Sequence, residues 1–312
     1  MKPLLEIEKL RVSFEGERPV NVLSGVSFSI QKGETLALVG ESGCGKSVIA
    51  HAVMRLLPSE ARVKGSVRFK GTELLELDEK RMSALRGNEL AIIFQNPSHA
   101  LNPVYSIGRQ LAEPLRVHQK QGKPDPSQKV LKALKQVGFS RPEHYMKYYP
   151  SWCSGGMNQR FLIATSTILG PELLIADEPS KGLDPDRIKE VERELRAHPG
   201  AGKTALLLIS HDLGFVRRLA DKIAVMYSGE IVELAEAADF FEQPLHPYSL
   251  GLLGSLPENG FVPIPGSAPA LSDPPSGCRF HPRCPYGEKR CLQEHPRLKD
   301  TKGRFVRCFL CP

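Results

Sequence analysis

The pattern of apolar positions predicts a series of short strands at the start of the chain. Apolar and polar residues alternate in three fragments, which is typical of half-buried strands, at 5–7, 12–14 and 26–30. A continuous apolar run at 35–39 has the character of a strand that is buried on both faces. Residues 48–57 contain neither Gly nor Pro and predict a helix. Two further strands are predicted at 67–69 and 90–94.

Helical periodicity replaces this pattern from about residue 98 to residue 168. Amphipathic spacing occurs at 106–118, at 127–137 and again after Ser154, and it predicts a helical insertion. Strand-like runs then return at 173–176, 204–209 and 223–226. Asp184 followed by Pro185 is typical of a helix start. Alternating strands and helices predict an α/β fold with a mostly parallel sheet and helices on both of its faces.

The chain changes character after residue 256. Residues 257–277 are crowded with Pro, Ser and Gly and predict a linker or an extended strap. Five of the seven cysteines follow, at 278, 284, 291, 308 and 311. We therefore expect two parts, one at 1–256 and the other, a linker with a small cysteine-rich tail, at 257–312. In a reducing cytosol, this clustering favours metal ligation over disulfides.

Composition indicates a soluble globular protein, with 41% hydrophobic and 25% charged residues in 312. No apolar run approaches the roughly 20 residues that span a bilayer, and the start lacks the apolar centre of a secretory signal. We expect a cytosolic chain that reaches a membrane only through partners. The net charge of +7 permits attraction to anions, but no dense Lys/Arg block is interleaved with aromatic residues. A diffuse solvated surface is favoured, and nucleic-acid binding is not indicated.

Between the strand at 35–39 and the helix at 48–57 lies a phosphate-binding loop pattern, made of Gly40, Glu41, Ser42, Gly43, Cys44, Gly45, Lys46 and Ser47. Its glycines let the backbone turn N–H groups toward phosphate oxygens, and the helix start adds its positive dipole end. Lys46 is expected to reach the terminal phosphates and the Ser47 hydroxyl to bind magnesium. A chance match in a Gly-rich turn is the alternative, and the residues described next weigh against it.

Polar residues stand at the ends of three later strands. Asp177 and Glu178 follow the apolar run 173–176, so Asp177 is expected to hold magnesium and Glu178 to deprotonate the attacking water. A solvated acidic turn is the alternative. His211 ends the run 204–209 and is expected to contact the terminal phosphate, although a single His is commonly structural. Gln95 also follows a strand and is expected to reach magnesium or the water.

A second anion site is predicted where Ser154, Gly155 and Gly156 precede a helix. An ordinary serine cap with two glycines fits the same spacing. Taken together and in this order, the phosphate loop, Gln95, the Ser-Gly-Gly-x-x-Gln-Arg segment, the two acids, the turn that ends at Asp184 and His211 resemble ATP-binding cassette (ABC) ATPases over residues 4–256.

The resemblance implies a P-loop ABC nucleotide-binding domain with a RecA-like core, an antiparallel β subdomain and a helical subdomain at about 98–168. It also implies a head-to-tail dimer, in which ATP on one subunit's phosphate loop is capped by Ser154, Gly155 and Gly156 of the other. Phe14 matches the aromatic position that stacks on adenine, and Asp184 joins the nucleotide-contacting residues. Cys153, Asn158, Ser180 and Lys181 depart from the family pattern. The phosphate-contacting residues are retained, so function with altered rates is expected.

The end of the chain resembles the oligopeptide/dipeptide importer subfamily, through His246-Pro247-Tyr248-Ser249 and the cysteine-rich tail. This resemblance implies that Cys278, Cys284, Cys291 and Cys308 bind a [4Fe–4S] cluster. Zinc, or free thiols and disulfides, are the alternatives, and Cys311 is an alternative to Cys308. The wide cysteine gaps weaken the zinc interpretation.

The function implied is ATP-driven import of dipeptides or oligopeptides at the cytoplasmic face of the inner or plasma membrane. The implied partners are a paralogous ABC ATPase, two permeases and an extracytoplasmic substrate-binding protein. Import of nickel or metal chelates is a close alternative. A soluble ABC protein acting on ribosomes or DNA is a more distant alternative, because such proteins usually carry two cassettes or a large zinc-bearing insertion.

Overall fold

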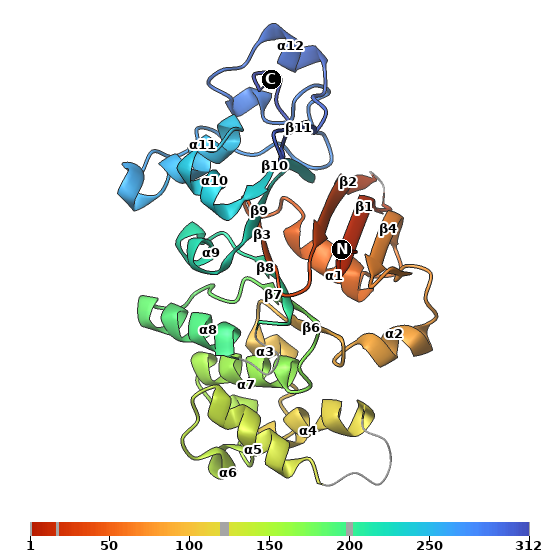
Figure 1. The fold of residues 1–312 in the computed structure, drawn as a ribbon, viewed down its shortest axis with the longest axis vertical. Helices are drawn as coiled ribbons and strands as arrows, with labels where there is room; N and C mark the ends of the chain where they lie inside the picture. The colour runs from red at the N-terminus through yellow and green to blue at the C-terminus, as the bar shows by residue number, and fades with distance from the viewer. Residues whose placement is uncertain (1, 17–18, 119–124, 198–201, 312) are drawn as a thin grey trace. The chain divides into compact units, whose positions relative to one another are not determined.

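The computed structural model describes residues 2–16, 19–118, 125–197 and 202–311 (Figure 1). The chain forms two compact units. The first comprises residues 1–30, 34–75 and 208–312, and the second comprises residues 31–33 and 76–207. Strand β8 (Ala205–Ile209) begins in the second unit and ends in the first. None of the helices in the described ranges is both long and apolar enough to cross a membrane.

The first unit contains an antiparallel sheet with the strand order β2-β1-β4-β5. Its strands are β1 (Leu5–Phe14), β2 (Val20–Ile30), β4 (Ala61–Phe69) and β5 (Thr72–Glu73). The sequence predicts two fragments where β1 is one strand. At Lys9 the backbone has a positive φ of 49°, and the pairing register with β2 shifts between Ile7 and Leu10. This bulge resets the alternation of apolar residues, which explains why the pattern reads as two pieces.

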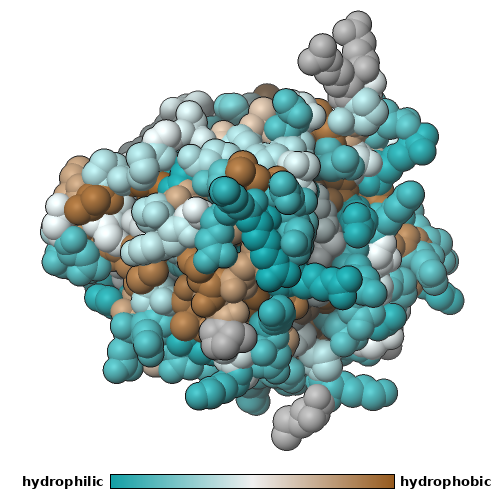
Figure 2. Space-filling model, turned by 90° about the horizontal axis from the view of Figure 1, so that it is seen from above, coloured by the Kyte–Doolittle hydropathy of each residue, from teal (hydrophilic) through white to brown (hydrophobic). Residues whose placement is uncertain are grey.

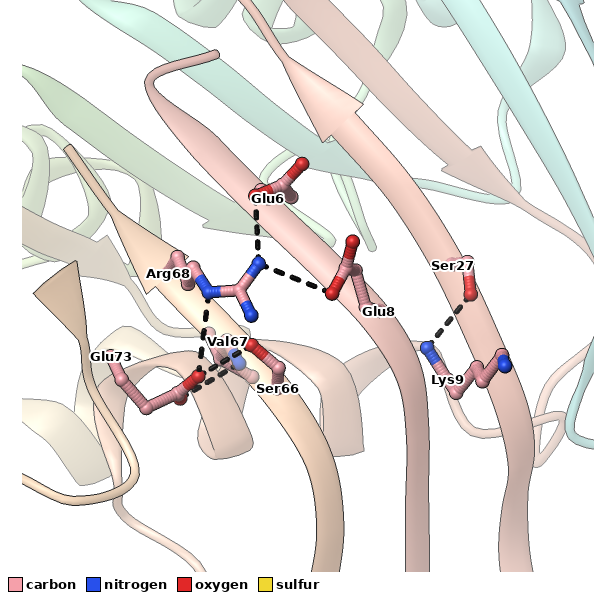
Figure 3. A network of polar contacts seen from close by, with 8 residues as sticks. All are labelled: Glu6, Glu8, Lys9, Ser27, Ser66, Val67, Arg68 and Glu73. Atoms are coloured by element: carbon pink, nitrogen blue, oxygen red, sulfur yellow. Dashed lines mark hydrogen bonds and ion pairs between the residues drawn. The ribbon is translucent and has the colours of Figure 1, made fainter. Parts of the chain in front are cut away.

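One polar face of this sheet is held by Arg68 of β4 (Figure 3). Its guanidinium lies 3.2 Å from the Glu6 carboxylate, 3.1 Å from Glu8 and 4.0 Å from Glu73. The Glu73 carboxylate also accepts hydrogen bonds from the Ser66 hydroxyl and, at 2.9 Å, from the Val67 N–H. These contacts connect side chains of three neighbouring strands, in which β4 is paired with β1 on one side and with β5 on the other.

The same unit contains strands in the order β11-β12-β10-β9-β3. Strands β3 (Thr35–Val39) and β9 (Lys222–Tyr227) are parallel, whereas β10 (Glu230–Glu236), β11 (Lys299–Thr301) and β12 (Arg304–Val306) pair antiparallel. The helices of the unit are α1 (Lys46–Met54), α9 (Leu213–Leu219), α10 (Ala237–Glu242), α11 (Pro247–Gly254) and α12 (Lys289–Gln293). Short 3-10 turns occur at Pro257–Asn259 and His281–Arg283.

The second unit has two parallel strands and a group of helices. Strands β6 (Leu90–Ile93) and β7 (Leu173–Asp177) are paired, with Ile93 opposite Ala176, and every residue in them is buried. The helices are α2 (Glu79–Leu85), α3 (Pro97–Ala100), α4 (Ile107–His118), α5 (Ser127–Gln136), α6 (Pro142–Tyr145), α7 (Gly155–Thr167) and α8 (Pro185–Ala197), with a 3-10 turn at Pro150–Trp152. Mixed sheets and helices of this kind confirm the predicted α/β class.

Hydrophobic side chains also remain on the surface of the cysteine-rich end. Seen from the end that carries the C-terminus, the molecule shows brown hydrophobic areas among hydrophilic ones (Figure 2). Exposed apolar residues after 256 include Phe261, Val262, Tyr286, Leu292 and Leu310. Such residues scattered among polar ones are common on folded proteins and indicate no binding site by themselves.

Candidate nucleotide-binding site

The phosphate loop follows β3, as the sequence predicts, and its last two residues, Lys46 and Ser47, begin α1. Gly40 has a φ of 146°, and a Cβ at this position would stand 2.2 Å from the Met226 carbonyl oxygen. Gly45, with a φ of 104°, precedes α1, and a Cβ there would stand 2.8 Å from Leu23. Glycine is therefore required at both positions, by space and by backbone conformation.

Lys46 turns back over its own loop. Its Nζ donates to the carbonyl oxygens of Gly40 at 2.7 Å and of Glu41 at 3.0 Å, and the side chain is only 6% exposed. The ammonium is thus held at the loop, where it can meet phosphate charge. Cys44 is buried beside it, and this burial raises the pKa of the Cys44 thiol.

Two other predicted residues belong to the same unit. His211 is exposed and follows Ser210, whose N–H donates to the Leu38 carbonyl oxygen at 3.2 Å. His211 is thereby placed next to the strand that leads into the phosphate loop. Phe14 ends β1 and is half-buried, so part of its ring is accessible. Its partners across the sheet are Val20 and Ala61.

In the second unit, the acids stand at the end of β7. Asp177 and Glu178 are only 4% and 8% exposed, and Glu178 has a positive φ of 50°. Such a backbone conformation is costly outside glycine and is concentrated at functional sites. Gln95 follows β6, the parallel neighbour of β7, so these polar groups lie at the carboxyl ends of adjacent strands.

A cavity of about 990 Å³ in this unit brings together several residues that the sequence singles out. Its lining includes Gln95, Ser154, Gly155, Gly156, Lys181 and Asp184. Ser154 caps α7, since its Oγ accepts from the Met157 N–H at 3.3 Å. Asp184 accepts from the N–H groups of Asp186 at 3.1 Å and Arg187 at 3.0 Å. The exposed N–H end of α7 therefore opens onto a space that suits an anion.

Sequence reasoning missed Arg187 in this cavity. Its guanidinium occupies the place of a side chain at Gly156, where a Cβ would meet it at 2.1 Å. Arg187 lies on α8, three residues after Asp184. This spacing is the sequence signal that could have placed Arg187 in the cavity beside Asp184.

Asn158, which departs from the family pattern, has a structural role. Its buried side-chain amide donates a hydrogen bond to the Pro150 carbonyl oxygen at 3.1 Å.

The phosphate loop also has partners from the end of the chain. The Glu41 N–H donates to the Tyr248 hydroxyl at 2.8 Å, and Arg283 lies 2.9 Å from the Glu41 carboxylate. Tyr248 belongs to the His-Pro-Tyr-Ser motif, but neither its contact nor that of Arg283 is signalled by a sequence pattern. His246 in the same motif is buried, which lowers its pKa to about 3, and its Nδ1 accepts from the Tyr248 N–H at 3.0 Å.

Comparison with known proteins decides the family. The family model described as ABC transporter matches residues 23–181. The chain belongs to the ABC transporter family. It carries the family's ATP-binding domain, and a second model, described as the C-terminal region of oligopeptide/dipeptide transporters, matches residues 232–291.

Relatives of this ABC ATPase match it over almost its whole length. It is 43% identical to the oligopeptide transport ATP-binding protein AppD of Bacillus subtilis, over 99% of this chain and 97% of that protein. It is 39% identical to the oligopeptide transport ATP-binding protein OppD of Salmonella typhimurium, over 98% and 93% of the two chains. Among solved structures, the ATP-binding cassette MJ0796 bound to ADP and Pi aligns with a TM-score of 0.67 at 21% identity. That alignment covers 75% of this chain and 98% of the cassette, and it confirms the fold.

Proposed function

We propose that this ABC ATPase energises the import of dipeptides or oligopeptides. The observation that carries the proposal is the full-length similarity to peptide-transport ATP-binding proteins, which includes the C-terminal region at 232–291. ATP hydrolysis is the activity of the family to which the chain belongs. In this proposal, other chains recognise the transported solute, and this chain hydrolyses the ATP that drives import.

The assembly that we propose has this subunit and a paralogous ATPase in a head-to-tail dimer. The dimer is bound to two permeases at the cytoplasmic face of the membrane, and an extracytoplasmic binding protein delivers the solute. The cavity at Ser154, Gly155 and Gly156 supports the dimer, because N–H groups at an exposed helix start are available to the phosphates of a nucleotide held by another subunit.

In the proposed reaction, Lys46 and the loop N–H groups bind the phosphates, and Phe14 stacks on the adenine. Ser47, Gln95 and Asp177 offer the oxygen ligands that magnesium prefers. When bound, magnesium neutralises charge on the phosphates. Glu178 accepts a proton from the attacking water, and His211 contacts the terminal phosphate. The left-handed backbone of Glu178 supports a specialised role for this carboxylate.

Replacement of Glu178 by Gln tests the proposed base. The variant removes the proton acceptor but keeps the shape of the side chain, so ATP should still bind while turnover falls by about 100-fold or more. Glu76→Gln, at an exposed carboxylate of the same unit, is the control and should keep full turnover. Wild-type ATPase activity in the Glu178→Gln assembly would refute the role.

Uptake assays test the transported solute. The complete transporter in vesicles, with its binding protein present, should accumulate a labelled tripeptide in an ATP-dependent way, and Lys46→Ala should abolish this uptake. ATP-dependent uptake of nickel or a nickel chelate without peptide uptake would favour the alternative importer class. Co-purification with ribosomes or DNA in place of permeases would contradict transport altogether.

We further propose that residues 257–312, which follow the ATPase domain at 1–256 and lie in the same compact unit as the phosphate loop, form a linker and a small cysteine-rich tail that binds a [4Fe–4S] cluster. Its ligands would be Cys278, Cys284, Cys291 and Cys308. All seven cysteines are free thiols. Burial raises the pKa of Cys278 to about 11, and the nearby thiols of Cys291 and Cys308 add to the rise. Burial raises the pKa of Cys284 as well, and the same two thiols add to the rise.

Within the part of the chain that the structure describes, no three His, Cys, Asp or Glu side chains are grouped closely enough to hold one metal ion. The proposed cluster is therefore supported by the resemblance of the tail and by its cysteines, which are clustered in the sequence. Cys311 neighbours Glu233 and Arg304 and bonds to the Leu245 carbonyl oxygen at 3.5 Å, which supports Cys308 as the fourth ligand.

Serine variants test this ligand set. In protein purified without oxygen, we expect bound iron and sulfide in wild type and in Cys311→Ser, and loss of both in Cys308→Ser. The hydrogen bond between the two thiols lowers the pKa of Cys308 to about 6, which favours the thiolate that binds iron. Zinc without sulfide in the wild-type protein would exclude the cluster.

A further inference from the structure

The phosphate loop is held from outside by the end of the chain. Glu41 is the first free position of the loop pattern, and its backbone N–H and its carboxylate each have a partner more than 200 residues away. Its N–H donates to the Tyr248 hydroxyl at 2.8 Å, and its Oε2 accepts from Arg283 Nη1 at 2.9 Å. All three residues lie in the same compact unit.

The two partners are buried and are themselves fixed. Tyr248 is fully buried, and Arg283 is 7% exposed. The Arg283 guanidinium also donates to the Pro265 carbonyl oxygen at 2.9 Å and to the Tyr227 hydroxyl at 3.4 Å. The rings of Tyr227 and Tyr248 pack with centroids 4.6 Å apart. Burial alone would lower the pKa of Arg283, but the bonds to Glu41 and Tyr227 raise it, so the guanidinium stays charged.

A second arginine of the cysteine-rich tail supports the other side of the loop. Arg279 donates to the Ser228 carbonyl oxygen and, at 2.9 Å, to the Ser24 hydroxyl. Gly229, which follows Ser228, donates its N–H to the Cys44 carbonyl oxygen at 3.0 Å. The tail is thus connected to the loop in two ways. Arg283 bonds directly to Glu41, and Arg279 is linked to Cys44 through the turn at Ser228 and Gly229.

The segment before the tail also lies near the loop. A cavity of about 390 Å³ is lined by both residues 41–44 and residues 268–272. The proline-rich segment therefore runs past the phosphate loop and ends in the tail that carries Arg279 and Arg283. Arg283 bonds to this segment at the Pro265 carbonyl oxygen and to the loop at the Glu41 carboxylate.

We propose that Arg283 and Tyr248 are positioning residues for nucleotide binding, and that they couple the order of the cysteine-rich tail to the affinity for ATP. The inference rests on the proposed ATPase function. Phosphate binding depends on N–H groups that are aligned before the ligand arrives, and the clamp on Glu41 restricts the backbone from which they project. Because coupling between two sites is reciprocal, bound nucleotide must in turn tighten the tail.

Nucleotide titration of the purified full-length subunit tests the clamp. We would measure the Kd for a fluorescent ATP analogue in wild type, Arg283→Gln, Glu41→Gln, the double variant and Tyr248→Phe. Arg283→Gln should weaken binding about tenfold, which corresponds to about 1.4 kcal/mol. The double variant should bind the analogue no more weakly than the weaker-binding single variant, because the Glu41 and Arg283 substitutions remove the same ion pair. Arg290→Gln is the matched control, because Arg290 lies in the same tail in an exposed pair with Glu294.

Hydrogen exchange provides a readout that a merely structural role would not change. The ATP analogue should slow exchange in residues 264–284 of the wild-type protein, and this protection should disappear in Arg283→Gln. Unchanged Kd in Arg283→Gln, or additive effects in the double variant, would overturn the proposal. If Arg283→Gln does not fold, Glu41→Gln tests the same ion pair, and a wild-type Kd in that variant would also overturn the proposal. A wild-type protein that binds no ATP would instead refute the proposed function.

Discussion

Glu194 on α8 provides a quantitative test of the electrostatics in the second unit. Its side chain is buried, and its Oε2 has no hydrogen-bond partner among the described residues. Burial raises its pKa from the ordinary 4.5 to about 7, although Arg160 and Arg187 oppose the rise. Glu190 adds to the rise, and Arg193 opposes it. The folded protein therefore favours the neutral carboxyl group.

The sign and the size of the effect follow from linkage. Between pH 4.5 and about 7 the folded state binds more protons than the unfolded state, so stability falls as the pH rises through this window. The free energy of unfolding should differ by about 3 kcal/mol between the low-pH and high-pH sides of this window, at about 1.4 kcal/mol per pKa unit. Glu194→Gln removes the ionisation. It should match wild type at pH 4 and exceed it by up to about 3 kcal/mol at pH 8.5.

Urea unfolding followed by the fluorescence of Trp152 measures this effect. Trp152 is the single tryptophan and lies in the same unit as Glu194, so it reports the unfolding of that unit. Asp186→Asn, at a 90% exposed side chain on the same helix, is the control and should show no such pH-dependent gain. A difference between wild type and Glu194→Gln that stays constant from pH 4 to 8.5 would refute the reasoning.

Two further predictions concern the first unit. Gly40→Ala should lower thermal stability by about 2 kcal/mol or more, because its Cβ would stand 2.2 Å from a backbone carbonyl, while Gly43→Ala, with open space around its Cβ, should lose less. A melting temperature that is lower for Gly43→Ala than for Gly40→Ala would contradict this prediction. Arg68→Gln should leave the melting temperature almost unchanged, since Arg68 is 38% exposed and its ion pairs are screened by solvent. A large drop would mean that the network in Figure 3 is essential to the sheet.

The elements with strong patterns were predictable from the sequence. The run 35–39 coincides with β3, and the amphipathic stretch 106–118 corresponds to α4. The local pattern failed where contacts distant in sequence decide the structure. The bulge at Lys9 interrupts the alternation in β1, and the short strands β11 and β12 form because a partner, β10, lies beside them.

The candidate site was predictable in the same uneven way. Lys46 and Gly40 belong to a pattern whose spacing is set by phosphate geometry, so the sequence alone identifies them. Arg283 and Tyr248 reach Glu41 only because the chain returns to the loop after more than 200 residues. No periodicity records such a return, and one sequence without an alignment gives no other signal.

The pairing of β12 with β10 has a practical consequence for anyone who shortens this protein. Glu233 and Leu234 pair with Val306 and Phe305, so the last hairpin covers the outer edge of β10. Removal of residues from 299 onward would leave peptide groups there open to another molecule's strand, which is how edge-to-edge aggregates begin. A truncated ATPase that ends after α11 should therefore form soluble oligomers or precipitate, even if its nucleotide-binding residues are all retained.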